Sequence, residues 1–182
     1  MTVKHLLYPC WMEETEQGRE LQKLAKEAGA SCQGIRAGDQ LELGNAEAAV
    51  IYPGDEETVT EPNAGSLVLC WEWAGVRTLF TGDLPEEKER ELLQKLPACE
   101  ILQVGHHGSA TSTCQEFLDR VQPSLAVISC ALTNRYGHPA PDTVGRLEKN
   151  GCEIRYTMKG GAVTVRQRGK EIRVEEYVTG GQ

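Results

Sequence analysis

The sequence predicts an α/β fold in which helices pack on sheets, rather than a doubly wound parallel sheet. Short apolar runs typical of strands alternate with amphipathic stretches typical of helices along the chain. Hairpin-like pairs of strands interrupt that alternation. A length of 182 residues, 40% of them apolar, suffices for one domain with a real core. We therefore expect a single domain over 1–177 and a flexible tail over 178–182.

The N-terminal half is predicted to hold one helix and several strands. The helix has an apolar stripe of leucine and alanine and stops at Gly29. A strand alternates well before the turn Ala74-Gly75, which leads into a second strand of a hairpin. In chain order the predicted elements are a strand over 3–8, the helix over 14–28, a short strand within 37–44, a strand over 48–52, a loop over 54–66, and the hairpin strands over 66–73 and 76–80.

The C-terminal half is predicted to alternate strands and helices and to end in strands. Pro85 suits the first turn of a helix, Thr111 or Ser112 is the expected cap of the next, and Asp142 is that of the third. Gly151 is the expected stop of the third helix. The predicted helices cover 86–95, 112–121 and 142–150, and the strands cover 100–104, 125–129, 153–157, 162–166 and 171–177.

Composition excludes several classes of protein. The net charge of −8 does not attract nucleic acid by its mean field, so DNA binding would need a local basic patch or a metal. No apolar stretch approaches the roughly 18 residues of a membrane helix, so we expect the chain itself to be soluble. Seven cysteines form no CxxC pair, which argues for reduced thiols rather than a disulfide framework or a structural zinc knuckle.

Three polar loops follow predicted strands: 81–83, 105–109 and 134–139. If these strands are neighbours, Asp83, His106, His107 and His138 converge, and a carboxylate with imidazoles is a typical ligand set for zinc or manganese. Each residue has a plainer alternative. Asp83 could cap the helix that follows it, the adjacent histidines could bond backbone groups, and His138 could be a turn residue. Neither a GxSxG elbow nor a phosphate-binding GxxxxGK[ST] loop is present.

Several motifs together resemble one family. They are Asn63 and Ser66 ahead of "LVL", then "TGD", "GHHGS", "NRYGHP" and the closing "TMKGGAVTV". This set is similar to the metallo-β-lactamase-like domain of the ComEC family of DNA-uptake (competence) proteins, over about 35–166. The resemblance implies two β-sheets sandwiched by helices, with a metal site at the sheet edges. It also implies a metal-dependent hydrolase of phosphodiesters, which in DNA uptake would degrade the strand that does not enter the cell.

The resemblance also implies roles for individual residues. Asp83 would be a metal ligand able to bridge two ions, one or both of the adjacent histidines would be ligands, and His138 would bind metal or contact the scissile phosphate. The catalytic and metal-binding set is thus Asp83, His106, His107 and His138, with zinc or manganese as the ion. Ser109, Asn134 and Tyr136 would contribute to substrate binding. Ser109 and Asn134 would also support the metal ligands from behind.

One large departure from the family is the missing HxHxDH or HxDxDH signature, which supplies half of the metal ligands. The chain therefore looks like the C-terminal two-thirds of the domain, an αββα sandwich incomplete at the N-terminus, from a fragment or a degenerate member. We expect the metal site to be empty or only partly occupied, and we expect the chain alone to have little or no hydrolase activity. We also expect a longer parent tethered to a membrane channel, with DNA as its substrate. The exposed, truncated edge would invite homodimerisation.

Two other functions stay open at this level. The chain could be a non-catalytic remnant or interaction module of the same fold, because the signature is absent. It could also be a phosphoesterase that cleaves choline or other headgroup phosphates at the cell surface. Substrate preference would separate this function from DNA hydrolysis, because the sequence shows no base-reading or stacking groove.

Overall fold

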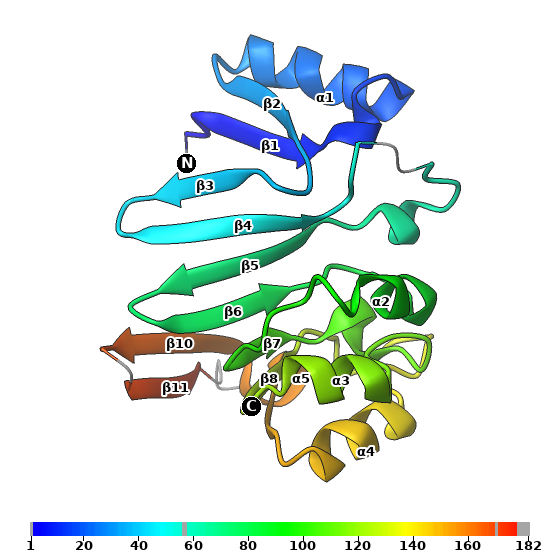
Figure 1. The fold of residues 1–182 in the computed structure, drawn as a ribbon, viewed down its shortest axis with the longest axis vertical. Coiled ribbons are helices and arrows are strands. Elements are labelled where there is room, and N and C mark those ends of the chain that lie inside the picture. Colours follow the sequence, from blue (N-terminus) through cyan, green and yellow to red (C-terminus); the bar gives the residue numbers. More distant parts are fainter. Residues whose placement is uncertain (1, 56–57, 170, 178–182) are drawn as a thin grey trace.

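A seven-stranded sheet runs through the middle of the computed structural model, which describes residues 2–55, 58–169 and 171–177 (Figure 1). In spatial order its strands are β3 (Gln40–Leu43), β4 (Ala46–Tyr52), β5 (Val68–Trp73), β6 (Val76–Phe80), β7 (Ile101–Gln103), β8 (Leu125–Ile128) and β9 (Glu153–Tyr156). Strands β3 to β6 form an antiparallel meander, whereas β6 to β9 are parallel. The parallel half places the C-terminal ends of β6, β7 and β8 at one edge of the sheet.

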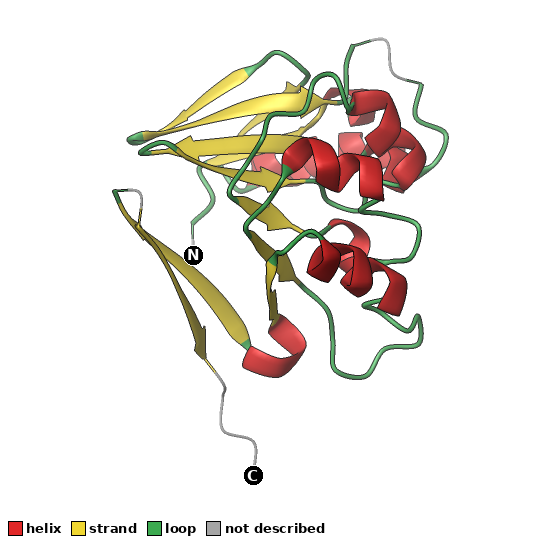
Figure 2. Cartoon of the chain, turned by 60° about the horizontal axis from the view of Figure 1, so that its bottom comes forward, coloured by secondary structure: helices red, strands yellow, loops and turns green. Residues whose placement is uncertain are grey.

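The two faces of this sheet are covered differently (Figure 2). Helices lie on one face, and a hairpin lies on the other. The helices are α2 (Glu86–Leu92), α3 (Gln115–Val121) and α4 (Pro141–Lys149), and the hairpin strands are β10 (Ala162–Arg168) and β11 (Glu171–Tyr177), entered through the one-turn helix α5 (Thr157–Gly160). The predicted packing of helices on sheets is confirmed, and among the described residues the second sheet consists of this antiparallel hairpin.

A smaller unit stands beyond β3. Strand β1 (His5–Pro9) pairs in parallel with β2 (Ser31–Ile35), and α1 (Glu16–Glu27) connects them. The Thr15 hydroxyl caps α1 by accepting a hydrogen bond from the Gly18 N–H at 3.0 Å. Three short 3-10 turns complete the elements: η1 (Cys10–Met12), η2 (Pro62–Gly65) and η3 (Gly105–Gly108).

The main hydrophobic core lies between the sheet and the helices. It contains Leu79 and Leu102 from the central strands and Phe117, Leu118 and Leu147 from the helices, all at most 1% exposed. Burying side chains of this kind stabilises the fold by roughly 1.5–3 kcal/mol each.

The side chains of strand β5 alternate between the two faces of the sheet. Val68 and Cys70 face the core, whereas the indole of Trp73 on the opposite face is 43% exposed. The tryptophans of β5 therefore point away from the helices.

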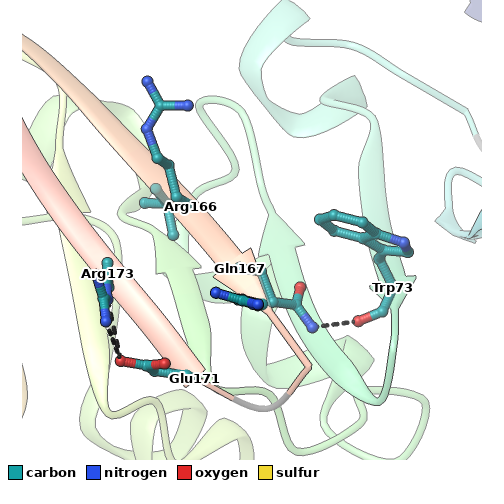
Figure 3. A pocket seen from close by; sticks show the side chains of 7 residues that line it. Trp73, Arg166, Gln167, Glu171 and Arg173 are labelled. Carbon is teal, nitrogen blue, oxygen red and sulfur yellow. Dashed lines mark hydrogen bonds and ion pairs between the residues drawn. The ribbon is translucent and has the colours of Figure 1, made fainter.

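The hairpin covers the aromatic face only in part. Val165, Ile172 and Val174 pack on the small cluster around Ile101, and the Gln167 amide donates to the Trp73 carbonyl at 2.7 Å (Figure 3). A groove of about 310 Å³, here called the hairpin groove, remains between hairpin and sheet; its lining includes Trp71, Trp73, Phe80, Val163, Val165 and Gln167. An adjoining hollow of about 530 Å³ is lined by Trp73 together with Arg166, Arg168 and Arg173.

Three details differ from the sequence predictions. Strand β2 was not predicted, because only Cys32 and Ile35 in it are apolar apart from glycine. Helix α3 begins at Gln115 after Cys114, not after Thr111 or Ser112, and Ala140 rather than Asp142 precedes the first turn of α4.

The expected tail over 178–182 lies outside the described residues. All seven cysteines are described, and none of them is paired in a disulfide. Within the described ranges, no helix is both long and apolar enough to cross a bilayer.

Candidate functional site

The three polar loops meet at one edge of the sheet because they follow neighbouring parallel strands. Asp83 comes just after β6, the His106-His107 pair follows β7, and the loop that holds His138 follows β8. Ligand groups gather at such an edge since each strand aims the first residues of its loop to the same side. The strands that carry the candidate residues are thus neighbours, as the sequence argument required.

Asp83 is held by its main chain and faces a histidine. Its N–H donates to the Ser66 hydroxyl at 3.1 Å, which ties the turn after β6 to the loop before β5. One carboxylate oxygen, Oδ1, lies 3.7 Å from the Nε2 of His107. Two bonds of about 2.1 Å to a shared ion at a tetrahedral angle would separate their ligand atoms by roughly 3.4 Å. The spacing is therefore close to that of two ligands of one ion.

The adjacent histidines occupy a strained turn. His106 and His107 have φ of +48° and +58°, in the left-handed region that costs a side-chain-bearing residue about 1–2 kcal/mol each. The His106 N–H donates to the Gly82 carbonyl at 2.9 Å, and His107 Nδ1 donates to the Ser129 carbonyl at 2.8 Å. Because Nδ1 of His107 donates this hydrogen bond, Nε2 is the ring nitrogen that faces Asp83.

His106 and His138 complete the cluster. Their ring centroids are 5.8 Å apart, and the Nδ1 atom of each is buried without a hydrogen-bond partner among the described residues. Buried polar nitrogens of this kind indicate a place for an ion, a ligand or a water. The Asn63 amide nitrogen lies 3.5 Å from Nε2 of His106.

The protonation of His138 favours a ligand role. Burial, followed by the neighbouring charges of His106 and His107, lowers the pKa of His138, whereas Asp83 opposes that shift. A lowered pKa keeps the imidazole neutral near pH 7, which is the form that can donate a lone pair.

Asn134 shapes the loop after β8. Its side-chain oxygen accepts the N–H groups of Tyr136 and His138 at 3.2 and 2.9 Å, and its amide nitrogen donates to the carbonyls of His138 and Ala131 at 2.7 and 3.1 Å. These bonds fill the capacity of the amide, so Asn134 positions His138 and has no bond left for a substrate.

A layer of buried polar groups lies behind the histidine turn. Ser112 donates to the Gly105 carbonyl at 2.9 Å, and Thr143 donates to the Ser109 carbonyl at 2.8 Å. The Ser109 hydroxyl bonds Thr111, inside its own turn. The buried polar residues of the described chain are Thr81, Glu89, Ser109, Ser112, Thr113 and Thr143. These groups fix the turn from behind, since buried polar atoms need partners in defined places.

Glu89 is the most unusual member of this layer. Its side chain is 0% exposed, and its two oxygens accept the N–H groups of Thr113 and Cys114 at 2.7 and 2.9 Å. It thus holds the residues at the start of α3 from α2. Sequence reasoning missed Glu89 because it stands in an acidic run that looks like a solvated helix face. Asn63 and Ser66 were noted only as parts of a motif.

The candidate ligands are arranged only in part as a metal centre would require. Asp83 and His107 face each other and two imidazole nitrogens lack partners, which fits the nitrogen and oxygen ligands of zinc or manganese. Yet no group of three or more His, Cys, Asp or Glu side chains among the described residues is arranged to hold an ion. The described residues therefore fit an incomplete centre.

Three competence-related proteins are similar in sequence to this chain. No family model matches the chain. It is 31% identical over 170 residues to ComE operon protein 3 of Bacillus subtilis, covering 92% of this chain and 22% of that protein. It is 33% identical over 116 residues to competence protein ComA of Neisseria gonorrhoeae, and 33% over 103 residues to recombination protein 2 of Haemophilus influenzae. The chain spans 17% and 13% of these two relatives.

Among solved structures, CmlA, a diiron β-hydroxylase from Streptomyces venezuelae, matches with a TM-score of 0.50 and 12% identity over 74% of this chain and 35% of CmlA. An E377D mutant of CmlA gives a TM-score of 0.51 with 9% identity, over 75% of this chain and 34% of the mutant. At this identity the likeness concerns the fold alone.

The layers and the loop cluster define an α/β domain of the metallo-β-lactamase fold. Over the part of their length that it matches, the chain is related to competence proteins of the ComEC family.

Proposed function

We propose that this domain supplies the metal- and phosphate-facing side of a phosphodiesterase site that acts on DNA during DNA uptake. The observation that carries the proposal is the pairing of Asp83 with His107 at 3.7 Å, beside the partnerless nitrogens of His106 and His138. In this proposal the domain works within a longer, membrane-associated protein, and the rest of that protein is its partner.

The roles of the residues follow from the donor set. Asp83, His106, His107 and His138 would hold a divalent ion, zinc or manganese. Such an ion, when bound, polarises a phosphoryl oxygen and lowers the pKa of water. His138 would bind either the ion or a phosphate oxygen, and its main chain is held by Asn134. Ser109 supports the turn from behind.

Four side chains provide too few ligands for a dinuclear centre. Two divalent ions take roughly eight to twelve ligand positions between them. We therefore expect this chain alone to bind an ion weakly and to hydrolyse phosphodiesters slowly or not at all.

Calorimetric titration with Zn²⁺ and with Mn²⁺ tests the proposal. The wild type is compared with an Asp83→Ala/His106→Ala/His107→Ala variant and with His5→Ala, which removes an imidazole far along the chain from these loops. Binding that is lost in the triple variant and retained in His5→Ala supports the proposal. Equal titrations of all three proteins would refute it.

The hairpin groove favours a second candidate function, that of an interaction module. Trp73 and Phe80 are 43% and 40% exposed there, although large apolar side chains normally seek cover. A second copy of the chain, or other strands of a longer protein, would bury them. Sedimentation velocity of the wild type and of a Trp73→Ser/Phe80→Ser variant tests self-association: a dimer lost in the variant supports it, and a wild type that stays monomeric at high concentration refutes it.

A further inference from the structure

We propose that a pocket between η1 and η2 binds an unpaired nucleobase of the strand whose phosphodiester lies at the candidate metal site. The inference rests on the proposed function and deepens it, because it adds a site for the uncharged part of the substrate. The pocket, here called the η2 pocket, has a volume of about 440 Å³. Its lining includes Pro9, Trp11, Met12, Gln17, Pro62 and Leu67.

The η2 pocket shares a wall with the candidate metal site. Ser66 also lines the pocket, and its hydroxyl accepts the Asp83 N–H at 3.1 Å. Asn63 of η2 places its amide nitrogen 3.5 Å from Nε2 of His106. Strands β1, β4 and β6 point to the same side of the molecule, so the segments that follow them lie on that side (Figure 1). The pocket and the candidate metal site are therefore neighbours.

The lining of the η2 pocket is largely apolar and carries no charge. Trp11, Met12 and Leu67 contribute apolar side chains, and none of the described residues that line the pocket is Asp, Glu, Lys, Arg or His. A cationic headgroup such as choline is held by carboxylates or by several aromatic rings, and this lining has one ring and no carboxylate. The pocket therefore suits an uncharged group, while the phosphate stays with the histidines.

The walls of the pocket are fixed before a ligand binds. Trp11 Nε1 donates to the Gly65 carbonyl at 2.9 Å, and a Cβ at Gly65 would come within 2.6 Å of that nitrogen, so the indole packs directly on the glycine. The Thr15 N–H and hydroxyl both donate to the Met12 carbonyl, at 2.9 and 2.7 Å, which ties η1 to the start of α1. Little conformational entropy is lost when a ligand enters a pocket that is already ordered.

Two polar groups of the lining favour a base over an alkyl chain. Gln17 is exposed, and its amide has no hydrogen-bond partner in the described part of the chain. The Ser66 hydroxyl accepts one hydrogen bond and keeps its own hydrogen to donate. An amide offers a donor and an acceptor to the edge of a base, whose flat faces match apolar walls. A base paired in a duplex has that edge occupied, so the pocket fits an unpaired base.

Tryptophan fluorescence tests where the base binds. The chain has three tryptophans, so Trp71→Phe/Trp73→Phe leaves Trp11 as the reporter. The probes are dithymidylate, in which one phosphodiester joins two thymidines, its abasic analogue and dibutyl phosphate. Dithymidylate is expected to change the Trp11 emission saturably, and the abasic analogue is expected to leave it unchanged. Dibutyl phosphate, which has the same charge but no base, should need about tenfold higher concentration.

Equilibrium dialysis of labelled dithymidylate compares variants of the full chain. Gln17→Leu is expected to weaken binding about two- to tenfold, because one hydrogen bond is lost. Trp11→Ala is expected to weaken binding about tenfold or more, because an apolar wall is lost. Gln17→Leu changes an exposed position and so keeps the test decisive if Trp11→Ala unfolds. Gln33→Leu is the matched control, since Gln33 is an exposed glutamine outside the pocket lining.

The results separate this inference from the proposed function. Unchanged Trp11 emission with dithymidylate would overturn the inference, as would an equal response to dibutyl phosphate or to phosphocholine. Equal affinities of Gln17→Leu and Gln33→Leu for dithymidylate would also overturn it. Metal binding, measured separately by calorimetry, reports on the proposed hydrolase site alone.

Discussion

Glu89 gives the sharpest test of how the candidate site is supported. Its carboxylate is fully buried and accepts two backbone N–H groups, at 2.7 and 2.9 Å, at the start of α3. Glu89→Ala leaves both donors buried without partners, at about 1–3 kcal/mol each, so the free energy of unfolding should fall by about 2–6 kcal/mol. In Glu89→Gln one donor keeps an oxygen and the other meets an NH₂ group, so the loss should be about 1–3 kcal/mol.

Urea unfolding followed by tryptophan fluorescence measures these changes. Glu87→Gln is the matched control: Glu87 is an exposed glutamate of the same helix, and its variant should stay within about 0.5 kcal/mol of the wild type. If Glu89→Gln and Glu87→Gln were equally stable, the carboxylate would not be holding α3, and the reasoning would be refuted.

The dependence on pH adds a second check. Burial raises the pKa of the Glu89 carboxyl above its ordinary value of 4.5, although its backbone hydrogen bonds lower it. A carboxyl with a raised folded-state pKa contributes stability that is complete below the unfolded pKa and is lost as pH rises through the folded pKa. The advantage of the wild type over Glu89→Gln should therefore be larger near about pH 5.5 than near about pH 8. An advantage that grows with pH would mean that the two N–H bonds dominate.

Three further predictions concern the backbone and the thiols. Gly108 and Gly137 both have a positive φ, of +79° and +72°, but only at Gly108 would an added Cβ meet neighbouring atoms. Alanine at Gly108 should therefore lower the free energy of unfolding by about 2–4 kcal/mol, and alanine at Gly137 by about 1 kcal/mol. Equilibrium unfolding of both variants measures the difference. His106→Gly should be at least as stable as the wild type. Glycine removes about 1–2 kcal/mol of backbone strain at the positive φ, whereas its greater freedom in the unfolded chain costs about 0.5–1 kcal/mol. A lower urea midpoint for the variant would contradict this. Burial raises the pKa of Cys99 and Cys114 to about 12, so peptide mass spectrometry should find both unlabelled by a thiol reagent until the chain unfolds.

Much of the fold could be predicted because hydrophobic periodicity and turn residues are local. The Ala74-Gly75 turn, the hairpin strands over 66–73 and 76–80, and the helix over 14–28 all appear close to their predicted places. Strand β2 escaped because its apolar residues are few, and the start of α3 was misplaced because its cap comes from another helix. Local patterns indicate elements well, but they carry no information about a capping group distant in sequence.

The candidate site, like the fold, could be predicted only in part from the sequence. The sequence by itself determined which residue types are present and that each follows a strand: Asp83 in "TGD", the histidine pair in "GHHGS" and His138 in "NRYGHP". Tertiary structure alone decided that β6, β7 and β8 are parallel neighbours, so that these loops meet at one edge. It also decided that Glu89 is buried and that Asn134 is saturated by its own loop. The physical reason is that side-chain chemistry belongs to each residue, whereas distance, burial and hydrogen-bond partners depend on how segments far apart in the chain pack together.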